Sequence, residues 1–182
     1  MTLYRCFPWN ARSAHDEPDG PLWISRPYQG GGRHDNPDLY GCLYLSEHPV
    51  ASVVELLAPF RNHRIAPSLL QQRGLPLALA AIAASERLDL IDLDDPAILM
   101  REQLRPSEVA TRIRLVTQPR TRVLYERHRS ADGLRWWSTF EASWINITLF
   151  DRAVPLLRVQ EVRALTVDDP TVSEAAAILG LS

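Results

Sequence analysis

The sequence predicts an α+β fold, because strand patterns and helix patterns both occur along one chain of 182 residues. Residues 134–138 alternate in polarity after a turn at Asp132-Gly133, and residues 144–150 are a second strand-like run that would pair with the first as a hairpin. Spacing at i, i+3, i+4 and i+7 predicts a core-facing helix stripe, formed by Val50, Val53, Val54 and Leu57. We therefore expect a central antiparallel or mixed sheet with flanking helices.

Length and composition favour a single domain over residues 1–182, with a core at about 3–160 and a C-terminal helix at about 169–180. A net charge of −2 without a basic run argues against direct nucleic-acid binding. No apolar run reaches the ~18 residues that span a bilayer, and the first residues lack a secretory pattern. Cys6 and Cys42 suit a reducing, cytoplasmic compartment, with a disulfide as the lesser alternative. No Cys/His spacing predicts a metal site.

In the N-terminal half, local patterns predict a first strand at Leu3–Phe7, a loop at 10–20 and a brief strand at Leu22–Ser25. A further strand covers Cys42–Leu45. Ser46 is a candidate N-cap for the helix that carries the valine stripe, and Pro59 ends that helix. The Ala/Leu-rich run from Leu75 to Leu88 predicts a second, buried helix.

In the C-terminal half, residues 88–93 alternate as a strand, and Asp95-Pro96 begins a short helix. Residues 107–117 predict another helix, which Pro119 interrupts, with Val109, Ile113 and Val116 facing inward. After the hairpin, residues 156–162 predict a last strand. Asp169-Pro170 then begins the C-terminal helix.

The glycine run Gly30-Gly31-Gly32 removes every Cβ from a bend, so the backbone can approach a ligand closely. Such bends often present several N–H groups to an anion. Arg33 follows at once, and its guanidinium can fork onto two oxygens of a phosphate or carboxylate. The alternative interpretation is a surface loop with a solvated arginine.

Four other side chains are candidates for a site. Tyr28 is interpreted as a packing aromatic or as a lid, with packing favoured. Tyr44 lies in the strand after the bend. Glu55 sits off the valine stripe, so its carboxylate can face a cleft or water. Ser138 closes the first strand of the hairpin, where a structural hydroxyl bonded to backbone is the competing interpretation.

The ordered set of motifs resembles the RES domain family, named for its Arg, Glu and Ser. The set consists of Tyr4-Arg5, Gly31-Gly32-Arg33, Tyr44, Glu55 and the run from Asp132 to Ser138, followed by the segment Leu149 to Arg152. The resemblance covers nearly the whole chain. It implies a fold similar to ADP-ribosyltransferases.

The resemblance also implies a function. RES proteins are toxins of bacterial toxin–antitoxin pairs that degrade NAD by phosphorolysis or hydrolysis, and the partner is an Xre-like helix-turn-helix antitoxin. Arg5 and Arg33 would hold the NAD phosphates, and Gly32 and Tyr28 would adjoin the substrate. Tyr44 would line the nicotinamide-ribose pocket, while Glu55 and Ser138 would act at the scissile ribose. NAD would be a substrate rather than a cofactor, with inorganic phosphate as a co-substrate, and a homodimer remains open.

This sequence departs from the family pattern at two places. His34-Asp35 stands where the family commonly has Trp-Asn, and Cys6 replaces an aromatic residue. The departure at His34-Asp35 favours one alternative to NAD degradation, a non-catalytic NAD-binding module. Two further alternatives are a protein ADP-ribosyltransferase, which would use nearly the same residues, and a serine hydrolase using Ser138, His128 and Asp132. The last lacks a Gly-x-Ser-x-Gly elbow.

Overall fold

A computed structural model describes all residues from Met1 to Ser182. The chain divides into two compact units. The first unit comprises residues 1–23, 45–84 and 157–182, and the second unit comprises residues 24–44 and 85–156. Strand β2 (Cys42–Ser46) begins in the second unit and ends in the first. That the chain is a single domain stays a prediction.

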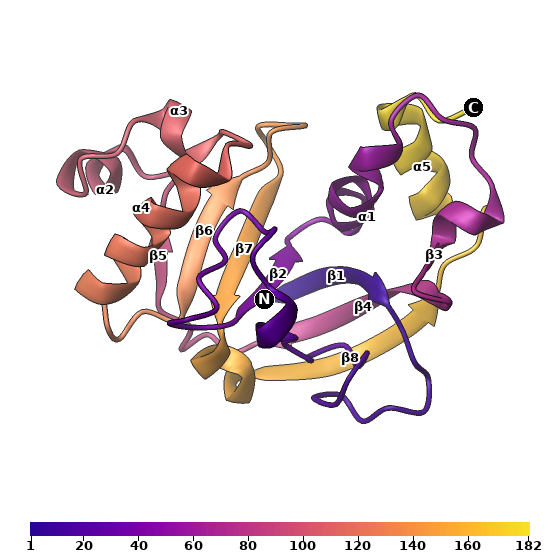
Figure 1. The fold of residues 1–182 in the computed structure, drawn as a ribbon, viewed down its shortest axis with the longest axis horizontal. Helices are drawn as coiled ribbons and strands as arrows, with labels where there is room; N and C mark the ends of the chain where they lie inside the picture. Colours follow the sequence, from indigo (N-terminus) through magenta and orange to yellow (C-terminus); the bar gives the residue numbers. More distant parts are fainter. The chain divides into compact units, whose positions relative to one another are not determined.

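Eight strands form a mixed sheet in the order β3-β4-β1-β2-β7-β6-β5, with β8 paired to β4 (Figure 1). All the registered pairs are antiparallel except β5 with β6. Helices accompany the strands in both units. The predicted α+β class is therefore confirmed.

The first unit is built around β4 (Leu75–Ala84), which pairs with β1 (Thr2–Pro8), β8 (Leu157–Ala164) and the two-residue β3 (Gln71–Gln72). The predicted helix over residues 75–88 is therefore wrong. A strand that is buried on both faces can be apolar without alternation, as the consecutive buried residues of β4 show, and a run of ten apolar residues has the length of a short helix. Because residues 75–84 pair with β1 and β8, they form a strand rather than a helix.

Helices α1 (Pro49–Leu57) and α5 (Pro170–Leu179) pack together in the first unit (Figure 1). The predicted stripe on α1 is confirmed, because Val50, Val53, Val54 and Leu57 are all buried. The predicted N-cap is wrong: His48 holds that position and Pro49 follows it, while Ser46 ends β2 and its Oγ accepts from the His48 N–H at 3.2 Å. The Ser52 hydroxyl links α1 to β1 by donating a hydrogen bond to the Tyr4 carbonyl at 2.8 Å.

The second unit confirms the predicted hairpin, with β6 (Gly133–Trp137) antiparallel to β7 (Ile145–Phe150). Strand β5 (Leu90–Asp92) runs parallel to β6. Helix α2 (Pro96–Arg101) begins as predicted, because the Asp95 carboxylate accepts from the Ala97 N–H at 2.8 Å. The core of this unit consists of aromatic and aliphatic side chains around Tyr40, Leu134 and Phe150.

The helix predicted over 107–117 begins within one residue of the expected position, and Val109 is buried as expected, but the helix does not continue to residue 117. Helix α3 (Pro106–Val109) stops early, and α4 (Arg114–Arg127) begins beyond it and continues through Pro119. Ile113 precedes α4 and is 59% exposed, rather than inward-facing. Pro119 removes one helical N–H···O bond. The buried side chains of α4 offset that loss, namely Thr117, Thr121 and Leu124.

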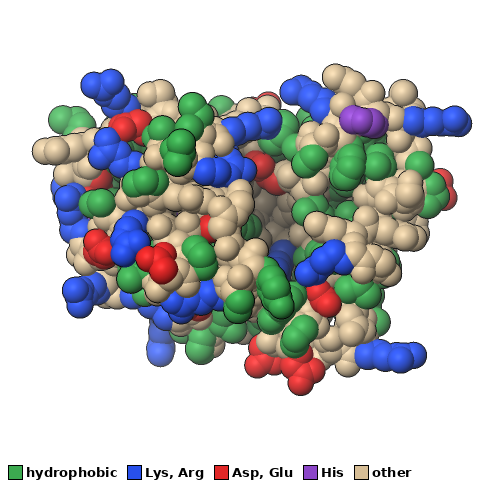
Figure 2. Space-filling model, viewed as in Figure 1, with side chains coloured by type: hydrophobic (Ala, Val, Ile, Leu, Met, Phe, Trp, Pro, Cys, Tyr) green, Lys and Arg blue, Asp and Glu red, His purple; other side chains and the backbone are tan.

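Surface charges of both signs lie interspersed on the face drawn in Figure 2. Ion pairs of the chain include Arg120 with Glu108 at 2.7 Å and Arg122 with Asp38 at 2.7 Å. None of the helices is both long and apolar enough to cross a bilayer. The brief strand predicted at Leu22–Ser25 is wrong, since Leu22 lies in a turn and the three residues after it have no regular structure.

A buried carboxylate, Glu102, ties α2 to the end of α4. Its oxygens accept from Arg127 at 2.6 Å, from Arg101 at 3.0 Å and from the His128 Nε2 at 3.0 Å. Burial opposes ionisation, but these hydrogen bonds hold the pKa of Glu102 below its usual value. A depressed carboxyl pKa stabilises the fold above the unfolded-state pKa, and the stabilisation is lost as the pH falls through the folded-state pKa.

We expect Glu102→Gln to lower the free energy of unfolding by about 2 kcal/mol at pH 7, because hydrogen bonds to a charged group are lost. The difference from wild type should shrink as the pH falls below about 4.5, the ordinary glutamate pKa. Urea unfolding followed by circular dichroism at several pH values measures both effects. Glu126→Gln, which alters an exposed ion pair with Arg122, is the matched control. A pH-independent difference would contradict this account.

Candidate functional site

The glycine bend is closed from within by the Asp35 carboxylate. Its Oδ2 accepts from the N–H groups of Gly30 at 2.8 Å and Gly32 at 2.7 Å. Its Oδ1 accepts from the Tyr44 hydroxyl at 2.7 Å. A Cβ on Gly32 would lie 2.5 Å from both that Oδ1 and the Tyr44 oxygen, so only glycine fits at this position without rearrangement.

This geometry corrects the expectation that the bend offers its amides to an external anion. A bend of this kind does bind an anion, but here the anion is the buried carboxylate of Asp35. Sequence reasoning noted Asp35 only as a departure from a family pattern. The sequence signal that could have identified its role is the spacing, since an acidic residue three positions after a glycine can accept a hydrogen bond from that glycine's N–H.

Side chains of α4 donate hydrogen bonds to the carbonyl oxygens of the glycine bend. Gln118 Nε2 donates to the carbonyls of Gly30 at 2.9 Å and Gly32 at 2.8 Å. Arg114 Nε donates to the Gly31 carbonyl at 2.9 Å, and the Thr117 hydroxyl donates to the Arg33 carbonyl. The bend is therefore a rigid support for the two residues after it, Arg33 and His34.

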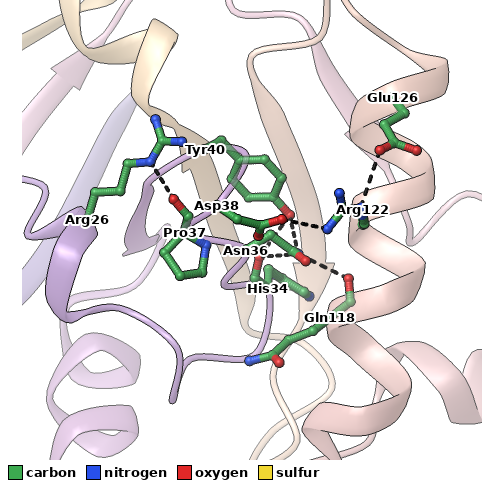
Figure 3. Close-up of polar contacts among 9 residues, drawn as sticks. All are labelled: Arg26, His34, Asn36, Pro37, Asp38, Tyr40, Gln118, Arg122 and Glu126. Carbon is green, nitrogen blue, oxygen red and sulfur yellow. Dashed lines mark hydrogen bonds and ion pairs between the residues drawn. The ribbon is translucent and has the colours of Figure 1, made fainter.

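A second set of polar contacts fixes the segment after the bend (Figure 3). Asn36 Nδ2 donates to the Tyr40 hydroxyl at 2.7 Å and to the Gln118 carbonyl at 3.1 Å, and Tyr40 in turn donates to the His34 carbonyl at 2.9 Å. Nearby, Arg26 Nε donates to the Pro37 carbonyl at 2.7 Å (Figure 3). These contacts leave little freedom to the backbone at His34.

Arg33 is buried, with 6% of its surface exposed, so the interpretation as a solvated surface arginine is wrong. Its Nη1 donates to the carbonyl of Val109, the last residue of α3, at 3.1 Å, and to that of Thr111 in the connection to α4. Its Cζ lies 4.6 Å from the centroid of the Trp136 ring. An arginine stacked on an aromatic ring and held by carbonyls presents its charge in a fixed direction.

His34 is also buried, at 3% exposure. Its Nδ1 lies 2.8 Å from the hydroxyl oxygen of Thr148 on β7, and the Trp136 Nε1–H donates to that same oxygen at 3.0 Å. The ring contacts Trp136 edge-on and stacks with Tyr44 at centroid distances of 5.1 and 6.4 Å. Burial lowers the pKa of His34 well below its usual value, and the charges of Arg33 and Arg114 lower it further. The imidazole is therefore neutral at physiological pH.

Tyr44 uses its hydroxyl fully within the second unit. The hydroxyl donates to Asp35 and accepts from the His34 N–H at 2.9 Å. Burial raises the pKa of Tyr44 well above its usual value, and the proximity of Cys42 and Asp35 raises it further. The phenol therefore stays protonated, and its ring is the part left to contact a ligand.

Ser138 and Tyr28 differ sharply in exposure. Ser138 is 2% exposed just after β6, and its Oγ accepts from the Phe140 N–H at 3.1 Å. Tyr28 lies in a 3-10 turn (Arg26–Tyr28) and is 83% exposed, so the favoured interpretation as a packing aromatic is wrong. A role for Tyr28 over a substrate stays a prediction.

The first unit holds the other two predicted site residues. Arg5, on β1, donates from Nη1 to the Pro21 carbonyl at 2.7 Å and lies 5.1 Å from the Phe7 ring centroid. Burial lowers the pKa of Arg5 to about 10, so it remains charged at neutral pH. Glu55 lies on α1 and is half-buried. That Arg5 and Glu55 join Arg33, Tyr44 and Ser138 around one substrate stays a prediction.

The serine hydrolase alternative is not supported by the contacts of its proposed members. His128 Nε2 pairs with Glu102, and the Asp132 carboxylate accepts from the Asp89 N–H at 3.0 Å. Neither contact joins a base to a hydroxyl nucleophile.

Cys6 and Cys42 are not joined in a disulfide. No group of three or more His, Cys, Asp or Glu side chains is arranged to hold a metal ion.

The fold and these contacts define an α+β protein in which a glycine bend, locked by its own aspartate, fixes a buried arginine beside aromatic rings. The RES domain family matches residues 2–171. The chain therefore belongs to the RES domain family, as the order of motifs in the sequence indicates.

Comparison of structures gives the same fold. The MbcT–MbcA toxin–antitoxin complex of M. tuberculosis contains a chain that matches with a TM-score of 0.63 at 16% identity, covering 98% of this chain and 88% of that one. At this identity the likeness concerns the fold alone. No curated protein matched the sequence.

Proposed function

We propose that this protein is an NAD-degrading enzyme that breaks the bond between nicotinamide and ribose. The observation that carries the proposal is membership of the RES domain family over residues 2–171, together with the buried and oriented Arg33 beside Trp136. In the proposed site Arg33 and Arg5 bind the pyrophosphate. Both guanidiniums have fixed directions, set by carbonyl contacts at Nη1.

The chemistry requires little beyond positioning and charge. The nicotinamide of NAD carries a positive charge, and it leaves as a neutral molecule with the electron pair of the broken C–N bond. The ribose develops oxocarbenium character as that bond breaks. A carboxylate such as Glu55 stabilises this charge more in the transition state than in the ground state.

The remaining residues would organise the nucleophile and the leaving group. Ser138 would hydrogen-bond a ribose hydroxyl or orient the incoming phosphate or water. The Tyr44 ring would give the pyridinium a flat, electron-rich face. The attacking group is inorganic phosphate in phosphorolysis and water in hydrolysis, and the proposal includes both.

We also propose that the protein is the toxin of a toxin–antitoxin pair, held inactive by a partner of the Xre-like helix-turn-helix class. The structural likeness to a chain of the MbcT–MbcA complex supports a partner of the antitoxin kind. Co-expression of the chain with the product of an adjacent helix-turn-helix gene should restore growth of cells that the chain alone arrests. Growth arrest that the partner does not relieve would contradict this part of the proposal.

Chromatography of NAD incubated with the purified protein tests the enzymatic proposal. We expect free nicotinamide in every case, with ADP-ribose 1″-phosphate as co-product if phosphate attacks and ADP-ribose if water attacks. A parallel reaction with labelled NAD and added cell extract separates out the ADP-ribosyltransferase alternative, because only a transferase leaves label on protein. Folded protein that releases no nicotinamide under any of these conditions would refute the proposal, and tight NAD binding without turnover would favour a binding module.

A further inference from the structure

The Thr148 hydroxyl determines which nitrogen of His34 carries the ring hydrogen. Only two polar atoms contact this oxygen, the Trp136 Nε1 at 3.0 Å and the His34 Nδ1 at 2.8 Å. An indole nitrogen only donates hydrogen bonds. The hydrogen of the Thr148 hydroxyl therefore has one acceptor, the His34 Nδ1.

A nitrogen that accepts a hydrogen bond carries no hydrogen itself. Because the pKa of His34 is well below its usual value, the ring holds a single hydrogen at neutral pH. That hydrogen must then sit on Nε2. Trp136, Thr148 and His34 form one directed chain, in which each hydroxyl or ring hydrogen points toward the next acceptor and the last donor is the Nε2–H of His34.

The Nε2–H of His34 has no hydrogen-bond partner within the chain. A buried donor left unpaired costs roughly 1–3 kcal/mol of stability, and such atoms are rare in this protein. The side-chain atoms that are both sealed from solvent and unpaired are Nε and Nη2 of Arg152. Nε2 of His34 is not among them, so this atom of an otherwise buried ring is not fully sealed from solvent.

We propose that His34 is a neutral hydrogen-bond donor that positions an acceptor oxygen of the bound dinucleotide through Nε2–H. The proposal rests on the proposed function for its ligand, and on the Trp136–Thr148–His34 chain for its chemistry. Arg33, the neighbouring residue, attracts a negatively charged oxygen, and the directed donor of His34 selects where an oxygen sits. A charged imidazolium at this place would bind any nearby anion with less discrimination.

The tautomer is read directly by two-bond ¹H–¹⁵N correlation spectroscopy of uniformly ¹⁵N-labelled protein at pH 7. The chain has five histidines, and the signals of His34 are those that vanish in His34→Gln. We expect Nε2 to be protonated and Nδ1 to be bare. Thr148→Val should abolish this preference, whereas Thr148→Ser, which keeps the hydroxyl, should preserve it. Protonation at Nδ1 in the wild type would overturn the inference.

Steady-state nicotinamide release measures the contact with substrate. Since one neutral hydrogen bond is lost, we expect His34→Phe to raise KM for NAD about tenfold. We expect His34→Gln, which retains an N–H donor, to recover most of that affinity. An active His34→Phe variant with wild-type KM would overturn the inference while leaving the proposed function intact. A wild-type protein that releases no nicotinamide removes the proposed function and this ligand together, and the NMR assignment of the tautomer still stands.

Discussion

Glu55→Gln is expected to lower kcat for nicotinamide release on the order of 100–1,000-fold, the loss seen when one preorganised electrostatic group is removed from an active site. The amide keeps the size of the side chain but carries no charge to stabilise the oxocarbenium-like ribose. KM should change little, because the positive charge on the ribose develops only in the transition state. Initial rates followed by chromatography of nicotinamide measure both constants.

The position of Glu55 on α1 allows an effect on catalysis to be separated from an effect on stability. The helix is anchored by the buried valine stripe and by the Ser52 hydroxyl on the Tyr4 carbonyl, so an isosteric change at Glu55 should shift Tm by no more than about 2 °C. Glu174→Gln on α5, in the same unit, is the matched control for a lost helix carboxylate. Wild-type kcat in Glu55→Gln would exclude this residue from the chemistry.

The sequence predicted the parts of the fold that depend on local chemistry. Asp95 and Asp169, each followed by proline, begin their helices as expected, and β6 and β7 pair as the predicted hairpin. The prediction from sequence was wrong at β4, because whether ten apolar residues form a strand or a helix depends on which strands pair with them. Those neighbours, β1 and β8, are far away in the sequence.

At the candidate site, too, the sequence predicted features of a short segment but not the contacts with residues remote in sequence. The residue types of the glycine bend and Arg33 were sufficient to single out this segment. They did not reveal that Arg33 is held by carbonyls near residue 110, or that Thr148 orients His34, because these partners come from helix connections and strands remote in sequence. The role of Asp35 was local, but an aspartate after a glycine bend is usually a solvated turn residue, so its type alone did not predict burial.

Asp35→Ala is expected to lower the free energy of unfolding by about 3 kcal/mol, since the carboxylate accepts three hydrogen bonds at a buried position and its removal leaves two glycine N–H groups and the Tyr44 hydroxyl without their acceptor. For a chain of this size the corresponding fall in Tm is about 10 °C. Differential scanning calorimetry and urea unfolding measure the two quantities. Activity should fall as well, because the bend supports Arg33 and His34.

Asp38→Ala is the control, because Asp38 lies in the same loop but forms an exposed ion pair with Arg122, a kind of contact that contributes little to stability. Asp35→Asn should fall between the two. The Asp35 site needs an acceptor at both oxygens, one for the glycine N–H groups and one for Tyr44. An amide supplies an acceptor at one position and a second donor at the other. Equal stability of Asp35→Ala and Asp38→Ala would mean that the carboxylate does not close the bend, and the rigid placement of Arg33 and His34 would then need another cause.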